Sequence, residues 1–565
     1  MNTDIRQRTI SGLSWSATSQ VVNQVFTFAI SIVLARLLGP KVYGLIGMIT
    51  VFTGFAGVFG DLALGAAIIQ RKELEPRHLN AAFWVNVTMG ATLTLLMVAL
   101  APVVAWFYKE PLLLPLTAVI ALKYFIDSLS AVKIAMLNRE MRFRTLAKIQ
   151  IGSSIISGLA GLGMALYGMG PWSLVAQTMG GAIVSTVIAW CLVDWHPRFS
   201  FEFRICKELF GFSAYVLAFD IFNYWARTMD QLLIGRFIGS AGLGVYSRAY
   251  SLMLMPLTQV SRVAGRVMFP ALSSIQDDKP RSKRIYLRAI SIIGLVTFPM
   301  MTGAFAVSDH LILALLGDKW VEVIPIFKIY CWVGLLQSIW TTIGWIYQSQ
   351  GRTGLYFTMG IGFIPLVVLA FFIGIRWGII GMAWSYFAAN LIWCYPSCTV
   401  AFRVINLTFW EMLRSLSPVF FCAVTMSIAV WSLELILPVG MAHWQYLAIQ
   451  IPFGMLFYLT FVVGLRLDSW REGSQALSEM TGGHLKSFNM FFQQLGFLPI
   501  LIPLGSLLYL VLVMPLKLDA WYEVLPAYIQ KFTENLKFVN AWFHHSEFLA
   551  IFLSFFQADF LSSVS

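Results

Sequence analysis

The segment LARLLGPKVYGL, residues 34–45, ends the first apolar stretch of the chain, and IGRFIGSAGLGV, residues 234–245, ends the seventh. Three positions match at an offset of 200 residues: Arg36 with Arg236, Gly39 with Gly239, and Gly44 with Gly244. Each segment leads into a long apolar stretch that runs back across the membrane. The repeat therefore predicts two six-helix halves of the same orientation, a pattern typical of transporters with the substrate between their halves.

The composition supports a membrane protein. Of 565 residues, 58% are hydrophobic and only 12% are charged, whereas soluble domains carry about 25% charged residues. The mean hydropathy is +0.76. This excludes a cytosolic enzyme, a secreted disulfide scaffold and a disordered chain, and the long uncharged runs favour helices over the alternating strands of a barrel. The net charge of +12 is explained by basic residues at cytoplasmic helix ends, so no nucleic-acid partner is expected.

We predict an all-α polytopic membrane protein with about 14 transmembrane helices. The expected spans are 12–38, 42–69, 81–107, 112–137, 149–168, 171–193, 211–237, 241–271, 286–308, 321–349, 355–375, 378–402, 415–437 and 443–465. Residues 1–208 would form an N-lobe of six spans and residues 209–404 a C-lobe of six, around a central cavity. Residues 405–469 add two spans, and residues 470–565 form a C-terminal extension that could hold one further membrane segment.

The basic residues predict the orientation. With the N-terminus inside, 23 Lys and Arg residues of the connections fall on the cytoplasmic side and 7 on the other. This bias holds loop by loop, as the positive-inside rule requires. We therefore expect a multi-pass protein of a bacterial inner membrane with a cytoplasmic N-terminus.

Charged residues inside the expected spans are costly in hydrocarbon, so each should face a partner or a wet cavity. In the span 211–237, Asp220, Asn223, Arg227 and Asp230 share one helical face, which predicts either a cavity wall or a structural pair of Arg227 with one of the acids. In the span 241–271, three arginines and no acid form a ladder about 27 Å long. They are Arg248, Arg262 and Arg266.

Guanidinium groups bind phosphate in a bidentate fashion, so this ladder favours an anionic cargo, although Arg262 and Arg266 could instead reach the membrane surface. Lys123 and Asp127 are spaced as an i,i+4 pair, for which self-neutralisation is at least as good an interpretation as a cavity role. Asp61 stands alone among glycines and could accept a proton or pair with Arg36.

Sequence motifs of catalysis are missing. The chain has no P-loop, no H-E-x-x-H and no D-x-D, and no connection among the spans exceeds about 20 residues. Cys394 and Cys398 lie four residues apart, but no histidine or second pair completes a metal site. We therefore expect no enzyme activity, no catalytic residues, no metal and no cofactor other than a coupling proton or sodium ion.

Several motifs, in order along residues 1–350, resemble those of Wzx-type polysaccharide flippases of the MOP exporter superfamily, in particular the colanic-acid exporter branch. They are TISGLSWSA (9–17), LARLLGPKVYGL, Gly60-Asp61 with AIIQRKEL (67–74), RVMFPALSSIQDD (266–278), Phe298-Pro299, GDKW (317–320) and VGLLQS (333–338). The resemblance implies a MATE-like fold. It also implies flipping of undecaprenyl-diphosphate-linked oligosaccharide to the periplasmic leaflet by alternating access, for exopolysaccharide, capsule or lipopolysaccharide synthesis. The implied partners are the lipid-linked glycan, membrane lipids and polysaccharide polymerase machinery.

On this basis the candidate site residues fall into two sets. The substrate-binding set is Arg36, Arg227, Arg248, Arg262 and Arg266, and the ion-coupling set is Asp61, Asp220 and Asp230. Arg262 and Arg266 would capture the diphosphate, and Arg227 and Arg248 would hold it midway.

Three alternatives remain open. A multidrug exporter of the same superfamily would want an acidic, aromatic cavity, which the arginines oppose. A flippase for the peptidoglycan precursor would rest on the same physics. A membrane O-antigen ligase or polymerase belongs to a different class, and the short external connections argue against it.

Overall fold

A computed structural model describes residues 23–60, 76–198, 213–438 and 440–465, and this part of the chain is helical without strands. The first helix is Asn23–Leu38. The long helices that follow in the N-lobe are α2 (Pro40–Gly60), α4 (Pro76–Tyr108), α5 (Leu113–Arg139), α6 (Phe143–Leu166) and α7 (Pro171–Leu192). The later long helices are α9 (Ser213–Phe237), α10 (Ser240–Ser273), α11 (Lys279–Ala306), α13 (Val323–Ser349), α14 (Thr353–Gly374), α15 (Gly378–Val404), α16 (Phe409–Glu434) and α17 (His443–Gly464).

Each of the fourteen expected spans corresponds to one of these helices. Ten segments of the described chain are long and apolar enough to cross a membrane, and one of them, Thr353–Val404, contains both α14 and α15. The number of fourteen helices is completed by Asn23–Leu38, α9 and α10. Helices α9 and α10 carry several of the charged residues discussed above. The protein is therefore a multi-pass helical membrane protein, as the hydropathy predicted.

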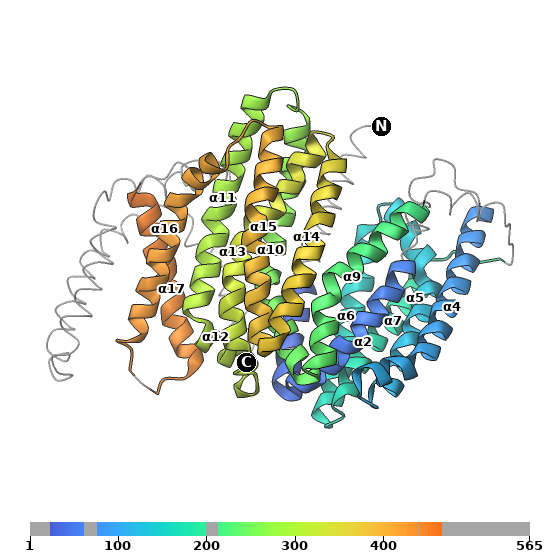
Figure 1. The fold of residues 1–565 in the computed structure, drawn as a ribbon. Coiled ribbons are helices and arrows are strands. Elements are labelled where there is room, and N and C mark those ends of the chain that lie inside the picture. The colour runs from blue at the N-terminus through green and yellow to red at the C-terminus, as the bar shows by residue number, and fades with distance from the viewer. Residues whose placement is uncertain (1–22, 61–75, 199–212, 439, 466–565) are drawn as a thin grey trace, which may run out of the picture.

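The two lobes repeat the same internal packing. In the N-lobe, α4 packs on α5, α5 on α7, and α6 on α7. In the C-lobe, α11 packs on α13, α13 on α15, and α14 on α15. Two groups of helices are visible in Figure 1, close together where α2 and α10 begin and spread apart toward the other end. We call the end where they meet the junction end.

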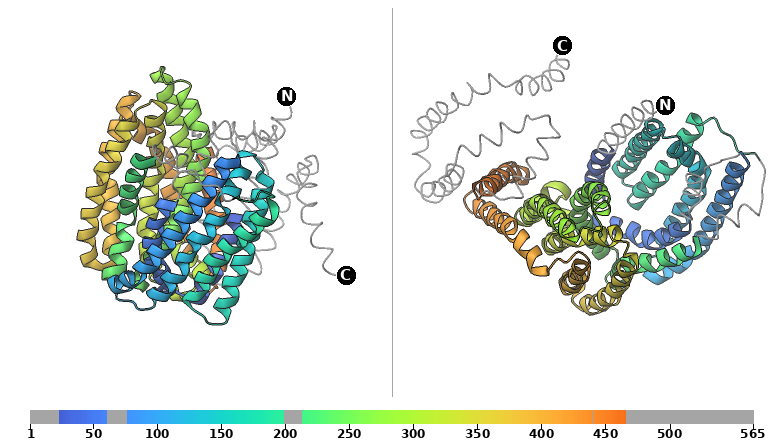
Figure 2. Two further views of the ribbon diagram at one scale, coloured as in Figure 1. Left: turned by 90° about the vertical axis from the view of Figure 1, so that its right-hand side faces the viewer. Right: turned by 90° about the horizontal axis from the view of Figure 1, so that it is seen from above.

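Three helices lie between or beyond these groups. The C-lobe helix α9 packs mainly on α2 of the N-lobe and, to a smaller extent, on α10 and α14. Helix α16 packs on the outer side of α11, and α17 packs on α16. The right-hand view in Figure 2 shows α16 and α17 (orange) at the edge of the C-lobe, away from the N-lobe.

Capping explains where two helices begin earlier than expected. Helix α11 starts at Lys279 rather than 286, because the Asp278 side chain accepts a hydrogen bond from the backbone N–H of Arg281. Helix α16 starts at Phe409 rather than 415, because Thr408 and Glu411 form a reciprocal capping box. The basic residues that precede the expected span 286–308 therefore lie in the first turns of α11.

The connection between α11 and α13 is also structured. It contains the short helix α12 (Ser308–Leu316) and the single turn η1 (Asp318–Trp320). A second single turn, η2 (Ile375–Trp377), joins α14 to α15. Residues 309–320 lie between the expected spans 286–308 and 321–349, and a helix of nine residues is too short to cross a membrane.

Candidate functional site

The repeat-related glycines meet at the junction end. A Cβ atom on Gly44 of α2 would lie 1.6 Å from the Ser240 carbonyl oxygen, and one on Gly244 of α10 would lie 2.0 Å from the Pro40 carbonyl oxygen. The contact is reciprocal, because each glycine faces the first residue of the other helix. No side chain larger than hydrogen fits at either position, so the residues that marked the repeat also bring the lobes together.

Arg248 of α10 lies beside this contact and reaches into the N-lobe. Its guanidinium donates to Ser31 Oγ at 3.0 Å and to the Ser31 carbonyl oxygen at 3.3 Å. It also lies 4.3 Å from the ring centre of Tyr43 and 5.9 Å from that of Trp320. Its Nε is buried without a hydrogen-bond partner, and the described residues place no carboxylate within ion-pair distance.

The other arginines of the predicted set lie farther from the junction end. Arg227 of α9 and Arg262 and Arg266 of α10 have exposed side chains and form no ion pair with any described residue. Helix α10 contains no acidic residue. No described carboxylate therefore compensates the positive charge of this helix, which makes it a suitable surface for an anion.

Arg227 does not pair with Asp230. Asp230 Oδ2 accepts a hydrogen bond from the Tyr246 hydroxyl at 3.1 Å, and Oδ1 accepts one from the Gln231 backbone N–H at 2.7 Å. The structure therefore does not contain the Arg227–Asp230 ion pair that the spacing allowed. Of the other acids in the ion-coupling set, Asp61 and the side chain of Asp220 lie outside the described residues.

Tyrosines of three helices gather next to Asp230, and the sequence analysis did not single them out. Tyr246 and Tyr250 of α10 each pack edge-on against Tyr330 of α13, with ring centres 5.5 and 5.6 Å apart. Tyr386 of α15 packs against Tyr330 at 6.2 Å, and its hydroxyl accepts a hydrogen bond from Gln337. The Tyr330 hydroxyl is buried without a partner in the described chain. Within the described chain, the Asp230 carboxylate is therefore bonded to a hydroxyl group rather than to a cation.

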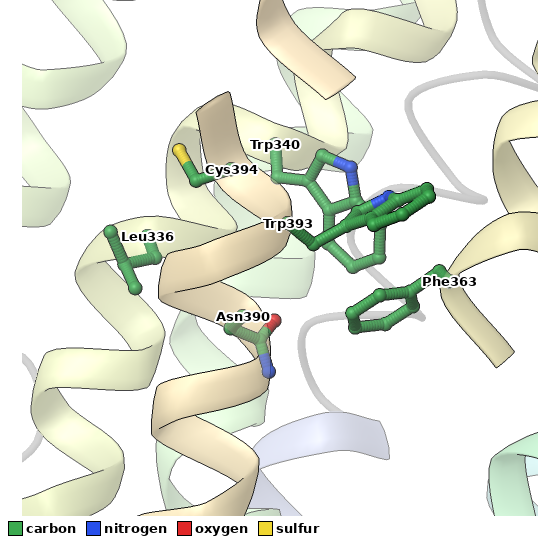
Figure 3. Close-up of a pocket in the computed structure, with 6 residues that line it drawn as sticks. All are labelled: Leu336, Trp340, Phe363, Asn390, Trp393 and Cys394. Atoms are coloured by element: carbon green, nitrogen blue, oxygen red, sulfur yellow. The ribbon is translucent and has the colours of Figure 1, made fainter. Parts of the chain in front are cut away.

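A small pocket lies close to this cluster, between α13, α14 and α15. Figure 3 shows its lining, which is half aromatic and contains none of the predicted site residues: Leu336, Trp340, Phe363, Asn390, Trp393 and Cys394. Asn390 connects the two features, because its side chain donates to the Tyr386 carbonyl oxygen at 2.8 Å. We assign no role in substrate binding to this pocket.

Three further predicted residues have clear partners. Lys123 and Asp127 form the i,i+4 ion pair that their spacing indicated. Arg36 of the first helix donates from Nε to the Leu315 carbonyl oxygen at 2.8 Å and from Nη2 to that of Ala314, so it binds the backbone of α12 in the opposite lobe. In this conformation Arg36 holds protein carbonyl groups, and an anion would have to compete with them.

The chain has relatives among known proteins. A family model described as "Polysaccharide biosynthesis protein" matches residues 33–325. The teichuronic acid biosynthesis protein TuaB of Bacillus subtilis is 28% identical over 469 residues, which cover 81% of this chain and 96% of TuaB. The lipopolysaccharide biosynthesis protein WzxC of Escherichia coli is 25% identical over 444 residues, 77% of this chain and 89% of WzxC.

The fold is also known from a solved structure. The lipid II flippase MurJ in an inward closed conformation superposes on this chain with a TM-score of 0.63. The match covers 79% of this chain and 97% of the MurJ chain. The sequence identity is 13%, so this likeness concerns the fold. It agrees with the two-lobed helical architecture that the repeat predicted.

Proposed function

Because the family match spans more than half of the 565 residues, this chain belongs to the polysaccharide biosynthesis protein family, and we propose that it flips a lipid-linked oligosaccharide across the membrane. The cargo would be a polyprenyl-diphosphate-linked glycan that moves from the cytoplasmic to the periplasmic leaflet. Its tail would stay in lipid while the charged head group passes between the lobes, since an unpaired charge in hydrocarbon costs many kcal/mol.

One observation carries this proposal: α10 carries arginines and no acid, and it packs against α2 of the opposite lobe. Arg262 and Arg266 lie in the half of α10 that is remote from the junction end, and both are exposed. They are suited to capture the diphosphate first. Arg227 and Arg248 would then hold it deeper between the lobes, with bidentate contacts that lysine could not reproduce.

Alternating access needs an energy source, and Asp230 is our candidate for the coupling site. Its carboxylate accepts hydrogen bonds from the Tyr246 hydroxyl and the Gln231 backbone N–H and has no ion-pair partner within the described chain. Because removal from water disfavours the charged form of a carboxylate, a part-buried carboxylate without a cation beside it is suited to take up a proton or a cation. Asp61 and Asp220 remain candidates from the sequence for the same role.

We also propose that the membrane is a bacterial inner membrane and that the N-terminus is cytoplasmic. The distribution of basic residues over the connections supports this orientation. The junction end would then face the periplasm, and the end where the helices spread apart would face the cytoplasm, the side from which the cargo is loaded.

The test is mass spectrometry of lipid extracts from cells depleted of this protein, combined with a membrane-impermeant label for glycans. We expect polyprenyl-diphosphate oligosaccharide to accumulate without the external label, and its mass would identify the repeat unit. If the lipid-linked glycan stays at its normal amount and is labelled from outside, the protein acts after translocation or on another cargo, and the proposal fails.

A further inference from the structure

The segment between α11 and α13 binds the end of the first helix through a motif that occurs twice. Residues 37–41 read LLGPK and residues 315–319 read LLGDK. Both glycines have a left-handed backbone, with φ of +77° at Gly39 and +84° at Gly317, and each ends a helix. One copy therefore terminates the first helix of the N-lobe, and the other terminates α12 of the C-lobe.

The two helix ends donate hydrogen bonds to each other. Arg36 binds the carbonyl oxygens of Ala314 and Leu315 in the last turn of α12. In return, Lys319 Nζ donates to the Leu37 carbonyl oxygen at 3.0 Å, and Trp320 Nε1 donates to that of Ala35 at 2.9 Å. The last carbonyl groups of a helix have no partner within it and carry partial negative charge, so cations are favoured there.

Packing around the two glycines brings these partners close. The nearest atom to a Cβ on Gly39 would be Cδ of Lys319, and the nearest to a Cβ on Gly317 would be Cγ of Arg36. The aliphatic part of the Lys319 side chain thus packs over Gly39, and that of Arg36 packs over Gly317. Trp320 is fully buried and packs edge-on against Tyr43 of α2, which anchors the turn η1 in the N-lobe.

The repeat-related residue Arg236 makes a different contact. It ends α9 as Arg36 ends the first helix, and its guanidinium lies 5.7 Å from the ring centre of Phe107 in α4. The short connection after α4 contains no counterpart of α12. A hydrogen-bonded contact between two helix ends of opposite lobes is therefore found, among the described residues, at Arg36 and not at Arg236.

We propose that α12 and η1 form a latch that keeps the lobes together at the junction end and that must release Arg36, Lys319 and Trp320 whenever the lobes part there. The latch gives a shared role to Arg36 and the GDKW segment. Arg36 caps the end of α12, and Lys319 and Trp320 of GDKW cap the end of the first helix. In this assignment Arg36 is a residue that controls conformation, and its contact with the cargo is not required.

The test is a distance measurement on the full chain in lipid nanodiscs. Spin labels would be attached in a background without native cysteines at Tyr167→Cys and Trp377→Cys, two exposed positions on opposite lobes at the junction end. The distance distribution is then compared between the parent, Arg36→Gln, Lys319→Gln and Lys41→Gln. Lys41 is the matched control, because it is the lysine of the other motif and no described residue bonds to it.

We expect Arg36→Gln and Lys319→Gln to shift the ratio of separated to closed lobes by roughly 10-fold or more, as the loss of charge-assisted hydrogen bonds predicts. Arg36→Lys should give an intermediate shift, and Lys41→Gln should match the parent. An unchanged distribution in both latch variants overturns the proposal, and so does an equal shift in Lys41→Gln. The measurement contains no cargo, so its result is independent of whether the protein flips a glycan.

Discussion

Arg248 is the residue on which the anionic-cargo proposal depends most. Its buried Nε and its lack of a carboxylate partner within the described chain leave it able to bind an anion when the lobes move. We expect Arg248→Ala to lower export by roughly 10- to 100-fold, in line with the loss of a charged hydrogen bond of about 1.5–3 kcal/mol. Arg248→Lys should retain only part of the parental export rate, because lysine cannot form the bidentate contact.

Export can be measured as the rate at which a lipid-linked glycan becomes accessible to an external label. Arg403→Ala is a suitable control, since Arg403 lies at the far end of α15 and belongs to neither proposed set. Parental export by both Arg248→Ala and Arg266→Ala would contradict the assignment of the ladder.

Asp230 offers a separate prediction, on energy coupling. We expect Asp230→Asn to reduce transport in proteoliposomes to the rate seen without an ion gradient, because the amide can take up neither a proton nor a cation as the carboxylate does. Tyr246→Phe removes one hydrogen bond to Asp230 but keeps the carboxylate, so it should retain gradient-driven transport at a reduced rate. Full gradient dependence in Asp230→Asn would place the coupling site elsewhere.

The crossing of α2 and α10 depends on the absence of side chains at two glycines. We expect Gly44→Ala to destabilise the protein by about 1–3 kcal/mol or more, because a methyl group cannot fit against the Ser240 carbonyl and the helices must separate. Gly57→Ala in the same helix is the control, since a Cβ there meets nothing within 4 Å and alanine favours helix by about 1 kcal/mol. Thermal unfolding in detergent distinguishes the two, and equal melting temperatures would show that the crossing tolerates a side chain.

The short elements between helices have functions that their length does not reveal. Helix α12 has nine residues and would not be stable alone, because short isolated helices lose more entropy than their hydrogen bonds return. It is held by packing on α17 and by Arg36 at its last turn. A connection that hydropathy treats as a loop thus becomes a contact between the lobes.

The orientation of the whole protein in the membrane is a prediction that single cysteines can check. Tyr167 and Trp377 follow helices that end at the junction end, whereas Met141 lies at the opposite end, between α5 and α6, and all three are exposed. With the N-terminus in the cytoplasm, an impermeant thiol reagent applied to intact cells should label Tyr167→Cys and Trp377→Cys. Met141→Cys should react only after the membrane is permeabilised. The reverse pattern would invert the topology.

Residue patterns alone determined the class of protein, the number of long helices and the division into two lobes. These features depend on hydrophobicity along the chain, which each segment must satisfy by itself in order to enter lipid. The pairing of Gly44 with Gly244 could be anticipated only as a repeat, because the offset of 200 residues does not say that the two copies touch. The Lys123–Asp127 pair was predictable because both members lie on one helix.

The tertiary structure decided which charged residues have partners. Arg227 could have paired with Asp230 by spacing, yet Asp230 turns to Tyr246, a residue of another helix. Arg36 and Arg248 look equivalent as membrane arginines, but Arg36 caps α12 whereas Arg248 keeps a buried nitrogen without a partner. Spacing along one helix specifies only which residues share a face, and the neighbours of that face are set by how helices from distant parts of the chain pack together.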